Sequence, residues 1–300
     1  MNNNYAIIMA GGIGSRFWPL SVPEKPKQFL DILGIGKTLI QMTYERLLPL
    51  VKAENIYILT NESYASLVQE QLPNLTAGQI LTEPQRKNTA PCIAYAAAKI
   101  VAINPQANMI VCPSDHLIMK EDRFHAIIQT AISDSEQTDS IVTIGINPTK
   151  AHTGYGYIEI DSKAERSAGS VSDVQQFREK PDLATAESFI NAGNFFWNSG
   201  IFIWKASTVI GALKNHQTDI YDLFCSDLSA YNTPEEQAFV NDAFNKTQDI
   251  SIDYAVLEKA SNVKVVVSDF DWSDLGTWGS LSEHIELDNA NNALIGENIH

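Results

Sequence analysis

The chain has 300 residues, of which 44% are hydrophobic and 19% charged, so it can bury the core of one large α/β domain. Its formal net charge of −15 argues against nucleic acid and anionic membranes as partners, because both require a basic protein face. No apolar run approaches the ~20 residues of a membrane span, and the N-terminus lacks the basic region of a secretory signal.

Strand and helix patterns alternate through the first half of the chain. Short apolar runs rich in β-branched residues predict strands at 5–10, 55–60, 79–82, 109–112 and 140–146. Apolar residues at helical spacing predict helices at 38–50, 62–72, 89–103 and 123–133. Repeated β–α units imply an α/β fold with a Rossmann-like, mostly parallel mixed sheet flanked by helices. Ligands bind beyond the carboxyl ends of such strands, so the loops after the first, third and fourth strands should meet at one rim.

The second half is less regular. It predicts strands at 157–160, 171–177, 195–204 and 263–267, a helix at 181–192, and several short helices within 207–259. No linker separates two globular halves, and no internal repeat is present.

The first predicted strand runs directly into a loop that contains Gly11, Gly12 and Gly14. Glycine allows backbone N–H groups to turn toward an anion, and three cations follow closely: Arg16, Lys25 and Lys27. This combination predicts a polyphosphate site. It is neither a P-loop, which needs Gly-Lys-Ser/Thr, nor a dinucleotide fingerprint, whose third glycine is missing here.

Acidic residues occupy the predicted strand ends. Asp115 follows an apolar strand and suits Mg²⁺, which prefers oxygen ligands, although a turn-forming role is the alternative. Glu83 can accept hydrogen bonds from guanine N1 and N2, a pairing that adenine cannot make. Asn88 can read a base edge, hold the loop, or merely cap the following helix. His116 has no Cys or His nearby, which favours a structural role over metal binding.

The composite motif GGIGSRFWPLS (11–21) followed by PKQFL (26–30) resembles the signature of the sugar-1-phosphate nucleotidyltransferases. The PKQFL ending is most similar to that of the mannose-1-phosphate guanylyltransferases. Further segments match the family in the same order: EPxxKNTAP (83–91), EKP (179–181), NSG (198–200) and WSDLGTW (272–278).

This resemblance implies a role for each matching residue. Nucleotide binding falls to Ala10, Gly11, Gly12, Gly14, Ser15, Arg16, Lys27, Glu83, Asn88 and Ser114. Sugar phosphate binding falls to Gly156, Glu179, Lys180 and Asn198. Catalysis falls to Arg16, Lys27 and Asp115, and the metal ligands are Asp115 and Asp274. Asp269 and Asp271 are expected to be solvated or to hydrogen-bond the loop.

The implied reaction transfers GMP from GTP to mannose 1-phosphate, giving GDP-mannose and pyrophosphate. Direct in-line attack would be assisted by Mg²⁺ or another divalent cation, and no general base is required because the nucleophile is already an anionic phosphate oxygen. Two alternatives stay open. One is a related enzyme that uses another nucleoside triphosphate or hexose phosphate, and the other is a non-catalytic nucleotide-sugar-binding regulatory subunit.

The resemblance also implies a nucleotidyltransferase, glycosyltransferase-A-like fold. We expect a catalytic domain at 1–288 with a sugar-side subdomain at about 147–260. Residues 289–300 would begin a truncated or short C-terminal extension, with the family's usual β-helical region largely absent. Three widely spaced cysteines predict reduced thiols and therefore a cytoplasmic protein. The acidic net charge predicts no nucleic acid or membrane partner. Homo-oligomerisation stays open.

Overall fold

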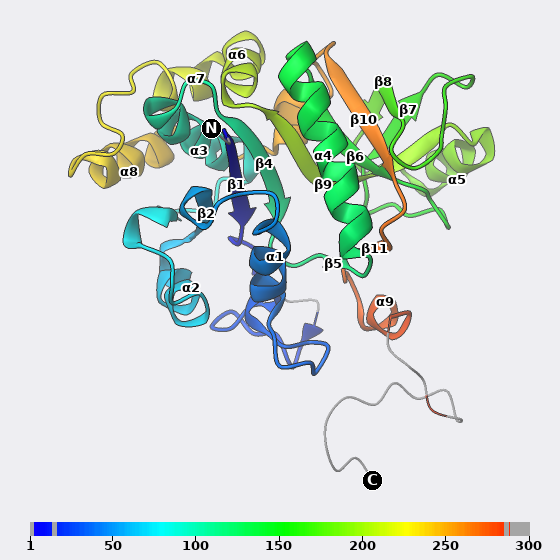
Figure 1. Ribbon diagram of the computed structural model, residues 1–300, viewed down its shortest axis with the longest axis horizontal. Helices are drawn as coiled ribbons and strands as arrows, with labels where there is room; N and C mark the ends of the chain where they lie inside the picture. The colour runs from blue at the N-terminus through cyan, green and yellow to red at the C-terminus, as the bar shows by residue number, and fades with distance from the viewer. Residues whose placement is uncertain (1–2, 14–16, 285–287, 289–300) are drawn as a thin grey trace.

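The computed structural model describes residues 3–13, 17–284 and 288 (Figure 1). Strands within these residues are β1 (Asn4–Met9), β2 (Ile56–Asn61), β3 (Ile80–Glu83), β4 (Asn108–Pro113), β5 (Leu117–Ile118), β6 (Ile141–Ile146), β7 (Tyr157–Ile160), β8 (Val171–Arg178), β9 (Phe195–Lys205), β10 (Val263–Ser268) and β11 (Trp272–Ser273). Nine of these described strands form one sheet, in the order β3-β2-β1-β4-β9-β6-β10-β8-β7, while β11 pairs with β5.

The sheet is mixed. Strands β3, β2, β1 and β4 pair in parallel, as do β6 and β10, whereas β9 runs antiparallel between β4 and β6. The predicted α/β class with a central mixed sheet is therefore confirmed. The sequence predicts a strand at the position of β9, but its local residues do not determine its direction in the sheet.

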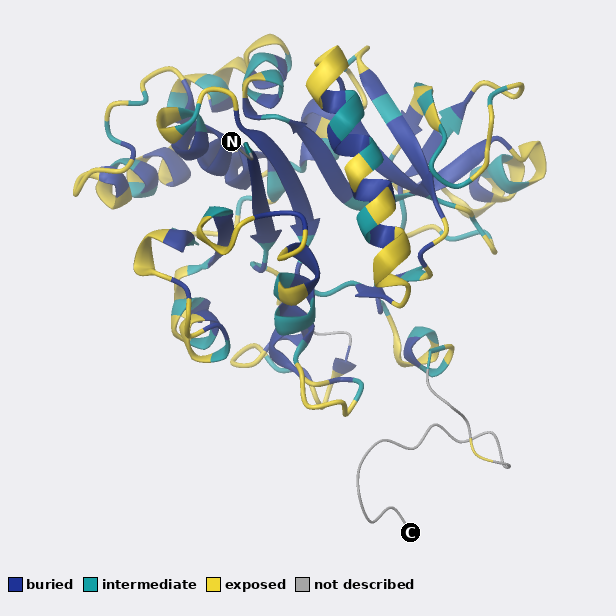
Figure 2. Cartoon of the chain, in the orientation of Figure 1, coloured by how far each residue is buried: buried dark blue, intermediate teal, exposed yellow. Residues whose placement is uncertain are grey.

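Helices cover both faces of the sheet. Their bounds are α1 (Leu39–Leu47), α2 (Ala65–Gln71), α3 (Thr89–Ile103), α4 (Glu121–Thr138), α5 (Leu183–Ala192), α6 (Ala206–His216), α7 (Thr218–Phe224), α8 (Glu236–Lys246) and α9 (Trp278–Ser282). Alternating side chains of β1 reach two cores: Tyr5 and Ile7 pack with α3 and α6 to α8, and Ala6 and Ile8 pack with α1, α2 and α4. Figure 2 shows the buried strands and the exposed outer surface of α4.

Local signals explain several of the boundaries. Thr38 and Gln41 form a capping box at the start of α1, and Asp182 caps α5. Helix α3 is alanine-rich and buried from Ala90 to Ile100, which lets α6 and α7 approach it closely. None of the helices in the described part of the chain has the length and apolar character needed to cross a lipid bilayer.

Candidate active site

The glycine loop lies at the carboxyl end of β1 and is held by Gln28. The Gln28 side-chain amide donates to the Ala10 carbonyl at 3.0 Å and to the Gly12 carbonyl at 2.9 Å. Ser114, at the end of β4, donates its N–H to the Met9 carbonyl at 3.0 Å. The predicted meeting of these loops at one rim is therefore confirmed. The predicted residues Gly14, Ser15 and Arg16 lie outside the described part of the chain.

Glu83 lies under the glycine loop, at the end of β3. A Cβ atom on Gly11 would lie 2.7 Å from Glu83 Oε1, so this position accepts no side chain without displacement of the carboxylate. Glu83 Oε2 accepts a hydrogen bond from the Cys92 thiol at 2.9 Å, and Arg86 donates to the Gly11 carbonyl at 3.1 Å. Burial raises the pKa of Glu83, and the Cys92 hydrogen bond and Arg86 only partly oppose it.

Asn88 is the N-cap residue of α3. Its backbone has φ of 64°, and its side-chain oxygen accepts from the Thr89 N–H at 2.9 Å. The Thr89 side chain makes a different contact, because its hydroxyl accepts a hydrogen bond from the Ile252 N–H at 2.8 Å. The structure therefore assigns the capping bond to Asn88 and shows Thr89 joining the loop to a distant segment.

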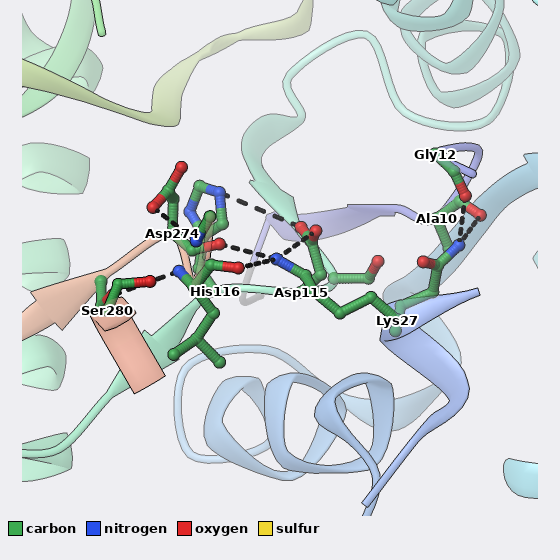
Figure 3. A network of polar contacts seen from close by, with 12 residues as sticks. Ala10, Gly12, Lys27, Asp115, His116, Asp274 and Ser280 are labelled. Carbon is green, nitrogen blue, oxygen red and sulfur yellow. Dashed lines mark hydrogen bonds and ion pairs between the residues drawn. The ribbon is translucent and has the colours of Figure 1, made fainter. Parts of the chain in front are cut away.

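Lys27 brings together the two acidic positions predicted far apart in the sequence. Its ammonium lies 2.9 Å from the Asp115 carboxylate and donates to the Asp274 carbonyl at 2.6 Å and the Leu275 carbonyl at 3.2 Å (Figure 3). The Lys27 side chain is 6% exposed, whereas that of Asp115 is 31% exposed. Burial opposes ionisation of Asp115, but Lys27 and His116 outweigh it and hold its pKa below the ordinary value.

His116 lies beside Asp115 in this centre. Its Nδ1 accepts a hydrogen bond from the Trp272 indole N–H at 3.2 Å, and its Nε2 lies 3.9 Å from Asp115. Burial lowers the pKa of His116, and Asp115 opposes that effect only in part. Trp272 therefore fixes the ring orientation of a histidine that faces Asp115.

The second acidic cluster separates into different environments. Asp274 accepts at Oδ1 from the Tyr155 hydroxyl at 2.7 Å and from the Gly276 N–H at 3.0 Å. Asp269 is 44% exposed and pairs with Arg123, and Asp271 is 52% exposed and pairs with Lys120. Only Asp274 of these three is built into the centre around Lys27.

The four predicted sugar-side residues also converge. A Cβ atom on Gly156 would lie 2.5 Å from Glu179 Oε2 and 3.3 Å from Asn198 Cβ. Glu179 pairs with Lys180 at 2.7 Å, while the Gly156 carbonyl accepts from the Asn198 N–H at 2.8 Å. Burial acts to lower the pKa of Lys180, but the Glu179 carboxylate outweighs it and the pKa is raised. These residues thus form one compact group.

Asp253 joins this group and was missed by the sequence reasoning. It begins a short π-helical turn, Asp253–Leu257, and its Oδ1 accepts from the Asn198 side-chain amide at 3.0 Å. Burial, followed by the charge of Glu179, raises the pKa of Asp253 to about 7. The signal available in the sequence was one carboxylate in an otherwise apolar segment, IDYAVL, which had been assigned only to short helices.

Asp115 and Asp274 are the candidate ligands for a divalent cation. Their carboxylates would supply the oxygen ligands that Mg²⁺ prefers, and Mg²⁺ usually completes its shell with water and substrate phosphates. Among the described residues, no group of three or more His, Cys, Asp or Glu side chains could hold a metal ion. A cation held by these two carboxylates would complete its shell with water or with a substrate phosphate rather than with further protein groups.

The family model described as nucleotidyl transferase matches residues 5–291, so the chain belongs to that family.

Individual proteins are also similar in sequence to this chain. The xanthan biosynthesis protein XanB of Xanthomonas campestris pv. campestris (strain B100) is 39% identical over 303 residues, covering 99% of this chain and 62% of XanB. A mannose-1-phosphate guanylyltransferase of Escherichia coli (strain K12) is 39% identical over 288 residues, covering 93% of this chain and 59% of that protein. The chain thus spans about three fifths of the length of these relatives.

A solved structure is also similar to this chain. The crystal structure described as a mannose-1-phosphate geranyltransferase from Thermus thermophilus matches with a TM-score of 0.87 and 30% identity. The match covers 98% of this chain and 83% of that one.

Proposed function

We propose that this chain transfers GMP from GTP to mannose 1-phosphate, producing GDP-mannose and pyrophosphate. The observation that carries the proposal is the Lys27 ammonium, which joins Asp115 to the backbone of Asp274 beside the glycine loop. The names of the relatives from Escherichia coli, Salmonella montevideo and Klebsiella pneumoniae support the same substrates.

The chemistry requires alignment of two anions rather than a general base, because the attacking phosphate oxygen is already charged. Lys27, with Arg16, would neutralise charge on the α-phosphate and the departing pyrophosphate. Lys180 would position the sugar phosphate as a point charge. Asp115 and Asp274 would hold a divalent cation, whose positive charge would stabilise the reacting phosphates.

Base recognition in this proposal rests on Glu83. Its buried carboxylate lies against Gly11, where the lack of a side chain keeps the loop open to it, and a carboxylate matches the two N–H groups of guanine. Asn88 would hold the loop through its capping bond. The backbone at Ala10, Gly11, Gly12, Gly14, Ser15 and Ser114 would face the phosphates.

The sugar would lie beside Gly156, with Glu179 and Asn198 contacting its hydroxyl groups. Both side chains lie within a few ångströms of Gly156, where a Cβ atom would intrude. Small-molecule sites typically use a few well-placed polar groups, and Glu179 and Asn198 would be two such groups here.

A pyrophosphate-release assay tests the proposal directly. The purified chain would be incubated with GTP, UTP, dTTP or ATP and with mannose or glucose 1-phosphate, with and without Mg²⁺. We expect release only with GTP, mannose 1-phosphate and Mg²⁺ together. Equal turnover with another nucleotide or sugar would instead assign a different nucleotidyltransferase activity. Binding of GDP-mannose without any turnover would indicate a regulatory subunit.

A further inference from the structure

Tyr155 connects the sugar side to Asp274 through a direct hydrogen bond. Its hydroxyl donates to Asp274 Oδ1 at 2.7 Å, and the Gly276 N–H donates to the same oxygen at 3.0 Å. The Asp274 carbonyl accepts from Lys27. The backbone and the carboxylate of Asp274 are thus held by its own loop and by two segments that are distant in the sequence.

The Tyr155 ring is fixed by an aromatic cluster that consists of His152, Tyr155, Trp197 and Trp272. His152 stacks on Tyr155 at a centroid distance of 3.8 Å, while Trp197 and Trp272 approach edge-on at 5.1 and 5.4 Å. Contacts on several sides restrict rotation of the ring, so the hydroxyl is aimed rather than free to turn. The cluster lines a cavity of about 1020 Å³ that Asp274 also borders.

The same aromatic cluster also extends toward Asp115, the other predicted metal ligand. The Trp272 indole donates to His116, which faces Asp115. The cluster therefore binds one predicted metal ligand directly, through the Tyr155 hydroxyl on Asp274. It contacts the neighbour of the other, through the Trp272 indole on His116.

Burial alone does not explain the Tyr155 hydrogen bond. The residue is only half-buried, so water could satisfy the hydroxyl without any contact to Asp274. Tyr155 also directly precedes Gly156, whose carbonyl binds the Asn198 N–H on the sugar side. One short segment thus fixes both the sugar-side backbone and the orientation of a distant carboxylate.

We propose that Tyr155 is a positioning residue whose hydroxyl orients the Asp274 carboxylate for a divalent cation. The inference rests on the proposed function, because the cation is the one that this chemistry uses. Groups that orient metal ligands typically change metal affinity or activity by ~10- to 100-fold when they are removed.

The test compares Tyr155→Phe with Tyr157→Phe. The first change keeps the ring and removes the hydroxyl that contacts Asp274. The second is a matched control, because the Tyr157 hydroxyl lies in the same segment but binds a different partner, accepting from the His152 N–H at 2.9 Å. Binding of Mn²⁺ to the substrate-free protein would be measured by electron paramagnetic resonance, together with the Mg²⁺ concentration that half-saturates pyrophosphate release.

We expect Tyr155→Phe to raise the Mn²⁺ dissociation constant and the Mg²⁺ requirement ~10-fold. Its melting temperature and the KM for mannose 1-phosphate should stay close to those of the unmodified chain, and Tyr157→Phe should bind Mn²⁺ normally. Unchanged Mn²⁺ binding in Tyr155→Phe, or an equal loss in Tyr157→Phe, would overturn the inference. Because Mn²⁺ binding is measured without nucleotide or sugar, failure of the substrate panel would overturn only the proposed function.

Discussion

The centre around Lys27 and the group around Asn198 handle charge in opposite ways. Lys27 is a buried cation paired with Asp115, and its charge helps to hold the pKa of that carboxyl low. Around Asn198, Glu179 and Asp253 place two carboxyls near each other, with Lys180 as an exposed cation, and the pKa of Asp253 is raised. The first arrangement favours the ionised form of Asp115, whereas the second disfavours the ionised form of Asp253.

This difference matches two kinds of ligand chemistry. Phosphates and metal ions require full charges fixed in place, because the charge is what binds and reacts. Sugar hydroxyls are neutral and need both donors and acceptors, which a protonated carboxyl and an amide together supply. The centre around Lys27 is therefore the proposed site of phosphate and metal binding, and the group around Asn198 is the proposed site of sugar recognition. The following experiments test the two regions separately.

The largest effect is expected for Lys27→Ala, because it removes the cation that joins the acidic positions. Turnover should fall ~10³-fold, the upper range for loss of one preorganised charge contact. Lys25→Ala is the control, since Lys25 is an exposed cation two residues away. Pyrophosphate release measures both variants, and near-normal turnover of Lys27→Ala would remove Lys27 from the reaction.

The second largest effect is expected for replacement of Asp274. We expect Asp274→Asn to lower turnover ~10²-fold and to increase the Mg²⁺ requirement. Asp271→Asn should change turnover little, because Asp271 is exposed and paired with Lys120, and Asn tolerates its φ of 54°. Titration of Mg²⁺ in the release assay checks both. An equal loss in the two variants would move the metal ligand to Asp271.

A smaller and more selective effect is expected on the sugar side. Asn198→Ala should raise the KM for mannose 1-phosphate ~10-fold, corresponding to one lost hydrogen bond of about 1.4 kcal/mol. The KM for GTP should stay within about twofold of its normal value. Asn194→Ala, which removes a buried amide that binds the Ile160 carbonyl, controls for loss of packing. A matching rise in both KM values would contradict a sugar-specific role.

The smallest effect concerns pH. The folded-state pKa of Asp253 is about 7, above the usual value for Asp, so the folded protein retains a proton that the unfolded chain releases at about pH 4. Stability from this group therefore falls as pH rises from about 4 to 7. Asp253→Asn should remove that loss and gain on the order of 1 kcal/mol at pH 6 relative to pH 5.

Urea unfolding at the two pH values measures this gain. Asp249→Asn is the control, because Asp249 is an exposed carboxylate nearby in the chain. If Asp253→Asn and Asp249→Asn show the same pH dependence, Asp253 does not titrate in this range.

The places of some candidate residues in the fold were predictable from their local sequence. Lys27, Glu83 and Asp115 stand next to strand ends or in a dense motif, and the parallel strands bring those ends to one rim. Strand and helix patterns were equally local, which is why most predicted ranges match the observed elements within a few residues.

Relations that depend on the assembled molecule were not predictable in this way. The antiparallel direction of β9 follows from pairing with β4 and β6, and no residue within β9 specifies it. The link between Tyr155 and Asp274 crosses 119 positions, and Asn198 meets Asp253 across 55. Neither partner signals the other in the sequence, so these contacts emerged only from the packed structure.

The hydrogen bond from Lys27 to the Asp274 carbonyl spans 247 positions, and this separation has a consequence for biosynthesis. Chains leave the ribosome from the N-terminus, so the lysine emerges long before its acceptor. A chain that ends after β4 contains every strand of the β3-β2-β1-β4 part of the sheet, but its Lys27 ammonium still lacks that acceptor. The proposed reaction centre is thus completed only after Asp274 has been synthesised, and we expect chains that end before it to lack the proposed activity.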